Sequence, residues 1–320
     1  MTSRAAPDEP RLKPVRHPWS FSAAWLNART LSWAAGFSIA LLFGGLWMML
    51  RAKPLPRRRV DFPAPPQLNA QISNAQDRLK ANPQDISALV ELGTLLFEKG
   101  KDSYVEAISD LEEARELGAL DPRVFYCLGI MYQEEGLYPF ALTEYQRFLR
   151  HYPEDKEIRL LAAKLYYRMG LFPEAVGEYE RLKYMSPTDP LVEENLGLSL
   201  WGAKLMDRAL GSFDQLKTYG GEFGRRADFY KGQIALEAGK FQEAADDFAQ
   251  VGIAQKPLTD IPSERVYTGL GMALQKLSRW EESKAAWEEV LKADPKDPKA
   301  QSALREVNRR LAAAKRTKKP

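Results

Sequence analysis

The sequence predicts an all-α protein, a solenoid of about six stacked helix hairpins preceded by one membrane-spanning helix. Two observations carry this prediction. Glycine, alanine and aromatic residues recur with a step of about 34 residues between residues 68 and 295. Residues 31–50 contain no charged side chain. A single helix hairpin cannot bury its own apolar face, whereas several stacked copies can, so the recurrence predicts a stack.

The clearest copy lies between residues 123 and 153. Phe125, Leu128 and Tyr132 stand at i, i+3 and i+7, which places them on one face of a helix. Gly129 beside them lets a second helix come close. Gly136 is expected to end the first helix, because glycine adopts the conformation found at helix C-termini.

The second half of this copy presents Ala141, Tyr145 and Phe148 on its helix, and Pro153 closes the unit. The spacing of aromatic, Leu-Gly, Tyr, Ala, aromatic and Pro residues resembles one unit of the tetratricopeptide-repeat family. The resemblance implies a right-handed α-solenoid whose units nest where small residues meet.

Five looser copies accompany the central one. Small residues are expected where their two helices cross, and Ala163 replaces the usual glycine of the first helix in the third copy. The other residues at these crossings are Gly93, Ala107, Ala175, Gly197, Ala209, Gly232, Ala244 and Gly271. The predicted solenoid covers residues 68–295, including a leading helix, and residues 296–320 form a capping helix and a basic tail.

The N-terminal part is expected to be organised differently. Residues 1–30 are expected to form a flexible basic tail, and residues 31–50 a transmembrane helix bracketed by Arg29 and Arg51. A cleaved secretory signal is the competing interpretation, but no small-residue cleavage site follows the run. Residues 51–67 are a basic, proline-rich linker. The protein is thus expected at a membrane as a single-pass protein. Its orientation stays open, with a cytoplasmic solenoid slightly favoured.

Charge is distributed unevenly along the chain. The formal net charge is +3, but residues 1–61 and 296–320 each carry +7, and the residues between them carry −11. An acidic folded region would repel phosphates, so the sequence argues against a nucleic-acid partner.

Sequence motifs for covalent chemistry are missing. The chain has no phosphate-binding GxxxxGKS/T, no GxSxG, no HExxH and no CxxC motif. Cys127 is the only cysteine and is expected to be a small buried apolar residue. His17 and His151 have no partner at ligand spacing. We therefore expect no catalytic residue, cofactor, metal or small-molecule substrate.

The resemblance implies that the first helices of the units line a concave groove that binds a protein or peptide. The corresponding positions here are strongly apolar: Phe97, Tyr126, Ile130, Leu160, Lys164, Tyr167, Asn195, Leu198, Trp201, Arg226, Phe229 and Leu236. Two interpretations remain. These side chains either anchor an extended or helical peptide, or they fill gaps within the stack.

Some members of the family bind a C-terminal carboxylate through a Lys/Asn/Lys clamp. Lys164, Asn195 and Arg226 occupy comparable places, whereas Leu160 and Tyr230 depart from that pattern. The expected function is that of a non-catalytic, membrane-anchored interaction scaffold. The alternative is a self-assembling structural subunit or a complex-assembly subunit of a membrane or envelope machine, for example in secretion, pilus or envelope biogenesis.

Overall fold

The computed structural model of the chain describes residues 66–252 and 257–317. All of them belong to one compact unit, Pro56–Pro320. Three predicted segments lie outside the described residues, the last of them except for its final two positions. They are the N-terminal tail (residues 1–30), the transmembrane helix (residues 31–50) and the linker (residues 51–67).

The predicted location as a single-pass membrane protein needs correction. Among residues 66–252 and 257–317, no helix combines the length and the apolar character needed to cross a bilayer. The uncharged run on which the prediction depended falls outside these two ranges. A single-pass membrane protein is therefore not supported.

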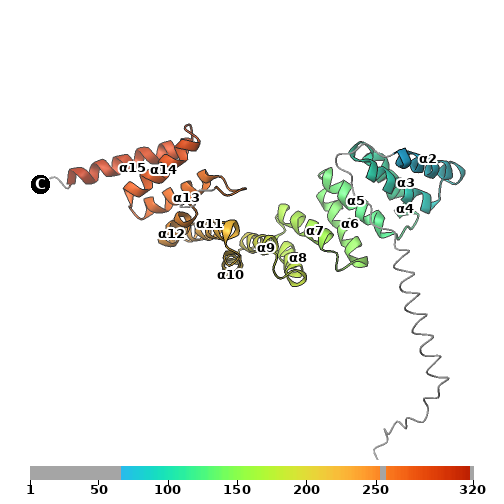
Figure 1. Cartoon of the computed structure of the whole chain (residues 1–320), viewed down its shortest axis with the longest axis horizontal. Helices are drawn as coiled ribbons and strands as arrows, with labels where there is room; N and C mark the ends of the chain where they lie inside the picture. The colour runs from blue at the N-terminus through green and yellow to red at the C-terminus, as the bar shows by residue number, and fades with distance from the viewer. Residues whose placement is uncertain (1–65, 253–256, 318–320) are drawn as a thin grey trace, which may run out of the picture. The chain divides into compact units, whose positions relative to one another are not determined.

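The described residues form fourteen α-helices and one short 3-10 helix, which confirms the all-α prediction (Figure 1). A leading helix, α2 (Pro66–Ala81), precedes six helix hairpins, and α15 (Pro298–Thr317) follows them. Repeats 1 to 6 are the pairs α3 (Ile86–Lys99) and α4 (Tyr104–Glu116), α5 (Pro122–Glu134) and α6 (Tyr138–His151), α7 (Lys156–Arg168) and α8 (Phe172–Met185), α9 (Pro190–Gly202) and α10 (Met206–Lys217), α11 (Gly221–Glu237) and α12 (Phe241–Gly252), and α13 (Ser263–Lys276) and α14 (Trp280–Ala293).

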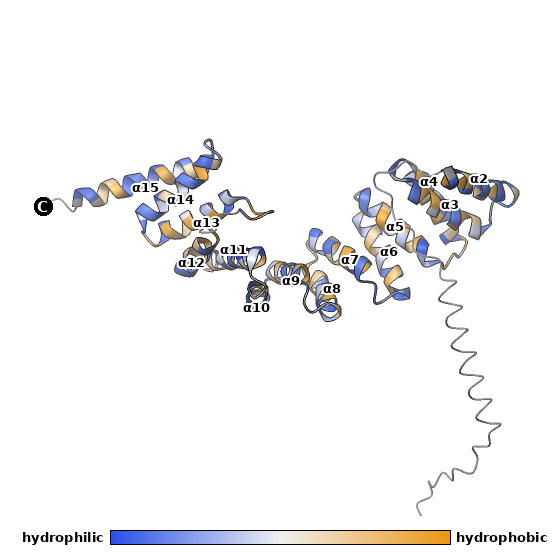
Figure 2. Cartoon of the chain, viewed as in Figure 1, coloured by the Kyte–Doolittle hydropathy of each residue, from blue (hydrophilic) through white to orange (hydrophobic). Residues whose placement is uncertain are grey.

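Each helix packs mainly on its neighbours in the chain. α2 packs on α3, the two helices of each repeat pack on each other, and α15 packs on α14. The helices carry hydrophobic and hydrophilic residues side by side, as amphipathic helices of a stack do (Figure 2). A large buried cluster extends from Ala163 in α7 to Leu274 in α13. A smaller cluster around Trp287 joins α14 to α15.

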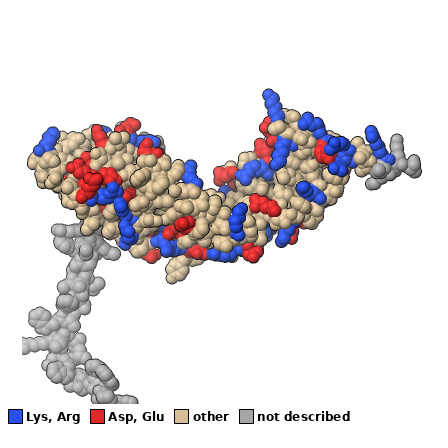
Figure 3. All heavy atoms as spheres, turned by 180° about the vertical axis from the view of Figure 1, so that it is seen from behind, with Lys and Arg blue, Asp and Glu red and all other residues tan. Residues whose placement is uncertain are grey.

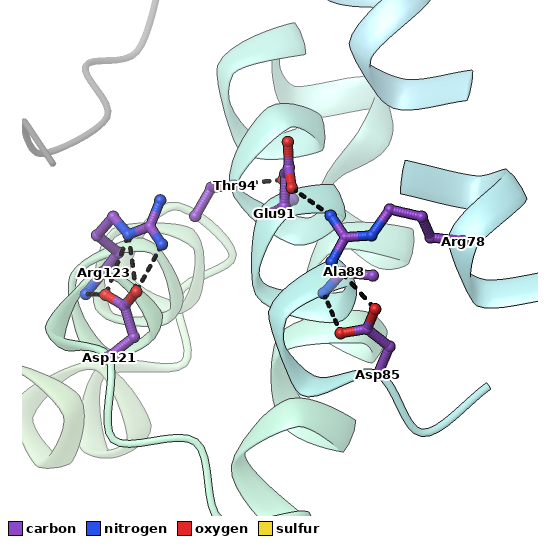
Figure 4. Close-up of polar contacts among 7 residues, drawn as sticks. All are labelled: Arg78, Asp85, Ala88, Glu91, Thr94, Asp121 and Arg123. Carbon is purple, nitrogen blue, oxygen red and sulfur yellow. Dashed lines mark hydrogen bonds and ion pairs between the residues drawn. The ribbon is translucent and has the colours of Figure 1, made fainter. Parts of the chain in front are cut away.

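The first helices of repeats 1 to 4 start in the same way. Asp85, Asp121, Asp155 and Asp189 each precede one of these helices, and each side chain accepts a hydrogen bond from a backbone N–H of the first turn. Such a cap stabilises a helix by about 1 kcal/mol. Figure 4 shows the first two caps.

The leading helix is tied to repeat 1 through the first of these caps. In α2, Arg78 donates to Asp85 at 3.0 Å and to Glu91 of α3 at 2.8 Å, so one guanidinium joins the leading helix to the cap and body of the next (Figure 4). Asp85 is thereby used twice, because its other oxygen accepts the Ala88 N–H at 3.0 Å.

The turn inside each hairpin uses a left-handed residue. Gly136, Gly170 and Gly239 have φ values of 76°, 74° and 74°. At the same place in repeats 4 and 6, Lys204 and Ser278 have φ values of 63° and 58°. Side chains at positive φ carry a steric cost, so these two turns are locally strained.

The helix crossings are equivalent in successive repeats. Ala141, Ala175, Ala209 and Ala244 are all 0% exposed, as the predicted nesting requires. Opposite them, a Cβ added to Gly129 or Gly197 would lie 2.5 or 2.6 Å from a ring carbon of Tyr145 or Phe213, respectively. In repeat 6 Ser283 takes the alanine's place, and its hydroxyl donates to the Gly271 carbonyl at 2.9 Å.

Candidate partner-binding surface

Three of the residues predicted to line the groove lie in the core. Phe97, Tyr126 and Phe229 are 1%, 7% and 1% exposed. Their rings contact other buried rings: Phe97 lies edge-on to Tyr126 at 6.2 Å, and Phe229 lies edge-on to Phe248 at 6.0 Å. At these positions the aromatic side chains fill the stack.

Most of the accessible part of the predicted groove belongs to repeats 3 to 5, and Ile130 of repeat 2 adds to it. Its apolar members are partly buried and pack on the large core cluster, so each is fixed in place while part of it faces solvent. They are Leu160 of α7, Leu198 and Trp201 of α9, and Leu236 of α11. Lys164 is exposed, Tyr167 is 38% exposed, and Ile130 of α5 is half-buried. We call Lys164, Tyr167, Leu198, Trp201 and Leu236 the groove surface.

Phe172 packs against Tyr167 and lies close to the helix end that carries Trp201. Tyr167 lies in the last turn of α7, edge-on to Phe172 at 5.4 Å between ring centroids. The Phe172 ring also covers Gly202, where an added Cβ would clash with it. The Phe172 ring, at the start of α8, thus packs against Tyr167 and against the backbone of the residue that follows Trp201.

Trp201 is also held by a polar contact. Its indole Nε1 donates to Glu237 Oε2 of α11 at 3.1 Å. This hydrogen bond spans two repeats and fixes the ring's orientation. An aromatic ring that is fixed before binding loses little side-chain entropy when a partner covers it.

Arg226 is engaged in the structure rather than free for a ligand. Its Nε donates to Glu194 Oε1 at 2.8 Å, and a second nitrogen lies 3.3 Å from Asp260 Oδ2. The same Glu194 oxygen accepts the Tyr230 hydroxyl at 2.7 Å. Burial, together with this hydrogen bond, raises the pKa of Tyr230. Glu194 is 2% exposed, so this ion pair joins α9 to α11 in the interior.

The possible carboxylate clamp is not assembled. Lys164 has no recorded partner within the described part of the chain. The Asn195 amide donates to the Leu191 carbonyl of its own helix at 2.7 Å, and Arg226 is paired as described. Of the three groups, only the Lys164 ammonium remains available to an anion.

Sequence reasoning missed a set of buried charges. Arg159, Glu193 and Asp228 are 6%, 1% and 6% exposed, and they occupy the same position in repeats 3, 4 and 5. Glu193 pairs with Lys183 at 2.8 Å and Asp228 with Lys217 at 2.6 Å. Arg159 donates to Glu178 and to the Pro153 carbonyl. Alignment of the copies would have found a charged residue where repeats 1 and 2 have Leu89 and Phe125.

Groups that could support metal or thiol chemistry are scarce in residues 66–252 and 257–317. No cluster of three or more His, Cys, Asp or Glu side chains there could hold a metal ion. Cys127 is 0% exposed, which confirms its predicted burial, and this burial raises the pKa of its thiol well above the usual value. A thiol in this state is a poor nucleophile.

Comparison with known proteins is consistent with this architecture. A family model described as a tetratricopeptide repeat matches residues 126–190 and 194–258. None of the curated proteins compared with the chain matches it.

Many solved structures resemble the fold, and two of them serve as examples. A structure of Naa15/Naa10 bound to HypK-THB is 18% identical with a TM-score of 0.55, and the match covers 75% of this chain but only 36% of that one. The C-terminal part of a TPR repeat-containing protein from Cytophaga hutchinsonii is 16% identical with a TM-score of 0.55, covering 74% of this chain and 98% of that one. These likenesses show the fold alone. The two matched segments, residues 126–190 and 194–258, together with the repeated hairpins of the described residues, show a tetratricopeptide-repeat fold.

Proposed function

We propose that this protein is a non-catalytic interaction scaffold that binds a partner peptide or protein on the groove surface of repeats 3 to 5. The observation that carries the proposal is the partial exposure of Tyr167 and Trp201 at equivalent positions of consecutive repeats. Their counterpart in repeat 1, Phe97, is buried.

The apolar character of the groove surface favours a partner with apolar anchors. Leu198 and Leu236 flank the two aromatic residues and keep part of their surface in solvent. Truncating a dominant aromatic anchor of an interface to alanine weakens the free energy of binding by about 2 kcal/mol or more. An extended or helical segment that places two apolar side chains over these rings would obtain most of its affinity there.

The charge of the groove surface adds a preference. Lys164 lies one helical turn before Tyr167 on α7 and has no recorded partner in the described residues. The nearby carboxylate Glu194 is already neutralised by Arg226 at 2.8 Å. A carboxylate on the partner, next to its apolar anchors, would therefore find a free cation at this end of the surface.

Photocrosslinking tests the location of the surface. A photoreactive amino acid at position 167 should yield a defined crosslinked partner, whose contacting segment is then identified and synthesised. The matched control is a photoreactive residue at position 184, because Tyr184 is 88% exposed but belongs to α8, the second helix of repeat 3. Equal crosslinking of the same partner at both positions would contradict the proposal.

Binding of the identified peptide then tests the anchors. Tyr167→Ala and Trp201→Ala should each weaken binding by about 30-fold, which corresponds to the loss of about 2 kcal/mol. Tyr184→Ala should leave binding unchanged, and the far-UV circular dichroism of all three variants should match that of the parent chain. Lost helicity in the first two variants would instead assign these rings to the core.

A further inference from the structure

A second concave site lies beside the groove surface and touches it through the hydrogen bond from Trp201 to Glu237. A cavity of about 600 Å³ opens between α10, α11 and α12, where repeat 4 meets repeat 5. Its floor is apolar and includes Met206, Leu210 and Ile234. Its rim carries five carboxylates and two lysines.

The charge in this cavity is unbalanced after its internal pairs are counted. Lys231 pairs with Asp214 at 2.6 Å, and Lys240 pairs with Glu243 at 3.3 Å. Among the described residues, three rim carboxylates then have no ion-pair partner within 4.0 Å: Asp207, Glu237 and Asp247. Glu237 accepts only the neutral indole N–H of Trp201, at 3.1 Å.

The environment of Asp247 is consistent with this excess of negative charge. Burial, together with the nearby carboxylates of Asp228 and Glu243, raises the pKa of Asp247 although Lys231 and Lys217 both lower it. Bringing a cation into the cavity would relieve this repulsion. The rim therefore favours a positively charged ligand on electrostatic grounds.

The shape of the cavity specifies the ligand further. An apolar floor below a ring of carboxylates suits a cation on an aliphatic stem, because the stem covers apolar surface while the head pairs with oxygen atoms. Lysine and arginine side chains have this form. A short basic peptide segment is thus the ligand class that fits the cavity.

The chain itself carries such a segment. Its C-terminal residues include Lys315, Arg316, Lys318 and Lys319, and residues 296–320 have a net charge of +7. Lys315 and Arg316 belong to the exposed last turn of α15. Figure 3 shows Lys and Arg side chains gathered at that end of the described chain.

We propose that the cavity between repeats 4 and 5 binds the basic C-terminal segment of a second copy of this chain. Within one copy α15 packs on α14, and none of the described residues of α15 lines the cavity. The contact joins two different surfaces. It therefore builds a ring if the rotation closes and an open row of copies if it does not.

Sedimentation of the full chain tests this contact. We expect concentration-dependent association that weakens as salt rises from about 50 to about 500 mM, because screening acts on charged contacts. A cavity variant, Asp207→Asn with Asp247→Asn, and a tail variant, with Lys315, Arg316, Lys318 and Lys319 each changed to Gln, should both remain monomeric. A parent chain that is monomeric at all concentrations would overturn the proposal.

A mixing experiment identifies the two surfaces as partners. The cavity variant keeps its basic segment and the tail variant keeps its cavity, so an equimolar mixture should form a one-to-one complex although each alone is a monomer. A mixture that stays monomeric would overturn the proposal. The proposal would also be overturned if the tail variant alone self-associated as strongly as the parent chain.

A gain of affinity separates binding from misfolding. Lys240→Gln removes a rim cation that pairs with exposed Glu243, and it should tighten binding of a labelled peptide of residues 309–320 by about threefold to tenfold. The titration uses the full-length tail variant, whose cavity is free. The peptide is titrated against the tail variant alone, against the tail variant with Lys240→Gln, and against the tail variant with Asp207→Asn and Asp247→Asn. Equal peptide affinity in all three proteins would overturn the proposal. Peptide binding without self-association of the parent chain would instead indicate a basic segment of another protein.

Tyr167→Ala tests whether the cavity contact is independent of the groove surface. It should leave self-association unchanged, because Tyr167 belongs to the groove surface and does not line the cavity. The cavity and the proposed groove can therefore fail separately.

Discussion

Repeats 1 and 2 differ from repeats 3 to 5 at one position of the first helix. Four residues before the small residue of the helix crossing, the first two repeats place Leu89 and Phe125, which are 2% and 6% exposed. The next three place Arg159, Glu193 and Asp228, which are just as deeply buried. One position of one fold thus accepts either apolar or ionised side chains.

The difference shows which contacts define the repeat. A small residue at the helix crossing recurs in both regions: in repeats 2, 4 and 5 a glycine faces a buried ring, and in repeat 1 Gly93 faces the Leu111 side chain. The side chain one turn earlier varies between apolar residues and charged residues that have a partner of opposite charge. Phe125 stacks on His151 of its own repeat at 5.7 Å, while Glu193 reaches back to Lys183 of the preceding repeat at 2.8 Å. A buried ion pair is costly to desolvate and is weak evidence for stability.

The largest expected effect comes from breaking one of these pairs. Lys183→Met leaves the Glu193 carboxylate, which is 1% exposed, without its cation and should lower the free energy of unfolding by about 3 kcal/mol. Adding Glu193→Leu makes repeat 4 resemble repeat 1 and should restore stability to within about 1 kcal/mol. Urea unfolding of the full chain measures both. As a control, Lys284→Met breaks a more exposed pair with Glu288 and should have almost no effect. A double variant as unstable as the single one would show that burial of charge is not the cause.

The second effect concerns the helix crossing that both regions share. Gly197→Ala would place a Cβ 2.6 Å from a Phe213 ring carbon and should cost about 2 kcal/mol. Repeat 3 already has Ala163 at this place, so Ala163→Gly should cost less, about 1 kcal/mol. Thermal unfolding followed by circular dichroism measures the difference.

The matched control for the crossing is Gly211→Ala in the exposed interior of α10. A Cβ there meets nothing within 4 Å, so alanine should stabilise the helix by about 0.5 to 1 kcal/mol. If Gly197→Ala were also stabilising, the crossing would not be as tight as the structure indicates.

The third effect contrasts Asp110 of repeat 1, which forms no ion pair within the described residues, with the paired carboxylates of repeats 3 to 5. Burial, together with Glu106 and Glu113, raises the pKa of Asp110 to about 6. Because this pKa in the folded state lies above that of the unfolded chain, ionised Asp110 costs stability above pH 6. The cost disappears as the pH falls toward about 4.

Asp110→Asn should therefore stabilise the protein at about pH 7.5 by at most about 1 kcal/mol, since solvent screens a partly exposed carboxylate. At about pH 4 the variant and the parent chain should have equal stability. Chemical unfolding at the two pH values measures the difference. A stabilisation that is the same at both values would argue against titration of Asp110.

The smallest effect comes from the hairpin turns. Lys204→Gly and Ser278→Gly should each stabilise the protein by about 0.5 kcal/mol, because φ values of 63° and 58° strain any residue except glycine. The gain is limited, since glycine also increases the entropy of the unfolded chain. Melting temperatures measure it. Ala203→Gly, one residue earlier at φ −73°, should give no gain.

The helix crossings could be predicted because their cause is local and repeated. Ala141 and its equivalents recur at one spacing, and that spacing dictates where a second helix can approach. The predicted alternation of two helices per unit followed from the same pattern. The membrane-spanning prediction depended on residues 31–50, which the described residues do not include, and the predicted location was not supported.

Accessibility of the groove could not be predicted, because it depends on neighbours outside the repeat pattern. Phe97 is covered by Tyr104, which stacks on it at 5.9 Å and follows the extra residues of the first hairpin turn. Phe229 lies under the guanidinium of Arg265 from the next repeat, 5.3 Å from its ring centroid. The ion pair between Glu193 and Lys183 could not be predicted from the sequence either, because the two residues belong to different helices, α9 and α8.

Packing mainly between neighbours in the chain has a mechanical consequence. Because no extensive contact links distant repeats among the described residues, a stretching force would pass through the hairpins in series, and each would bear the full load. The hairpin that yields first would then set the force at which the chain lengthens, and the remaining hairpins would stay intact.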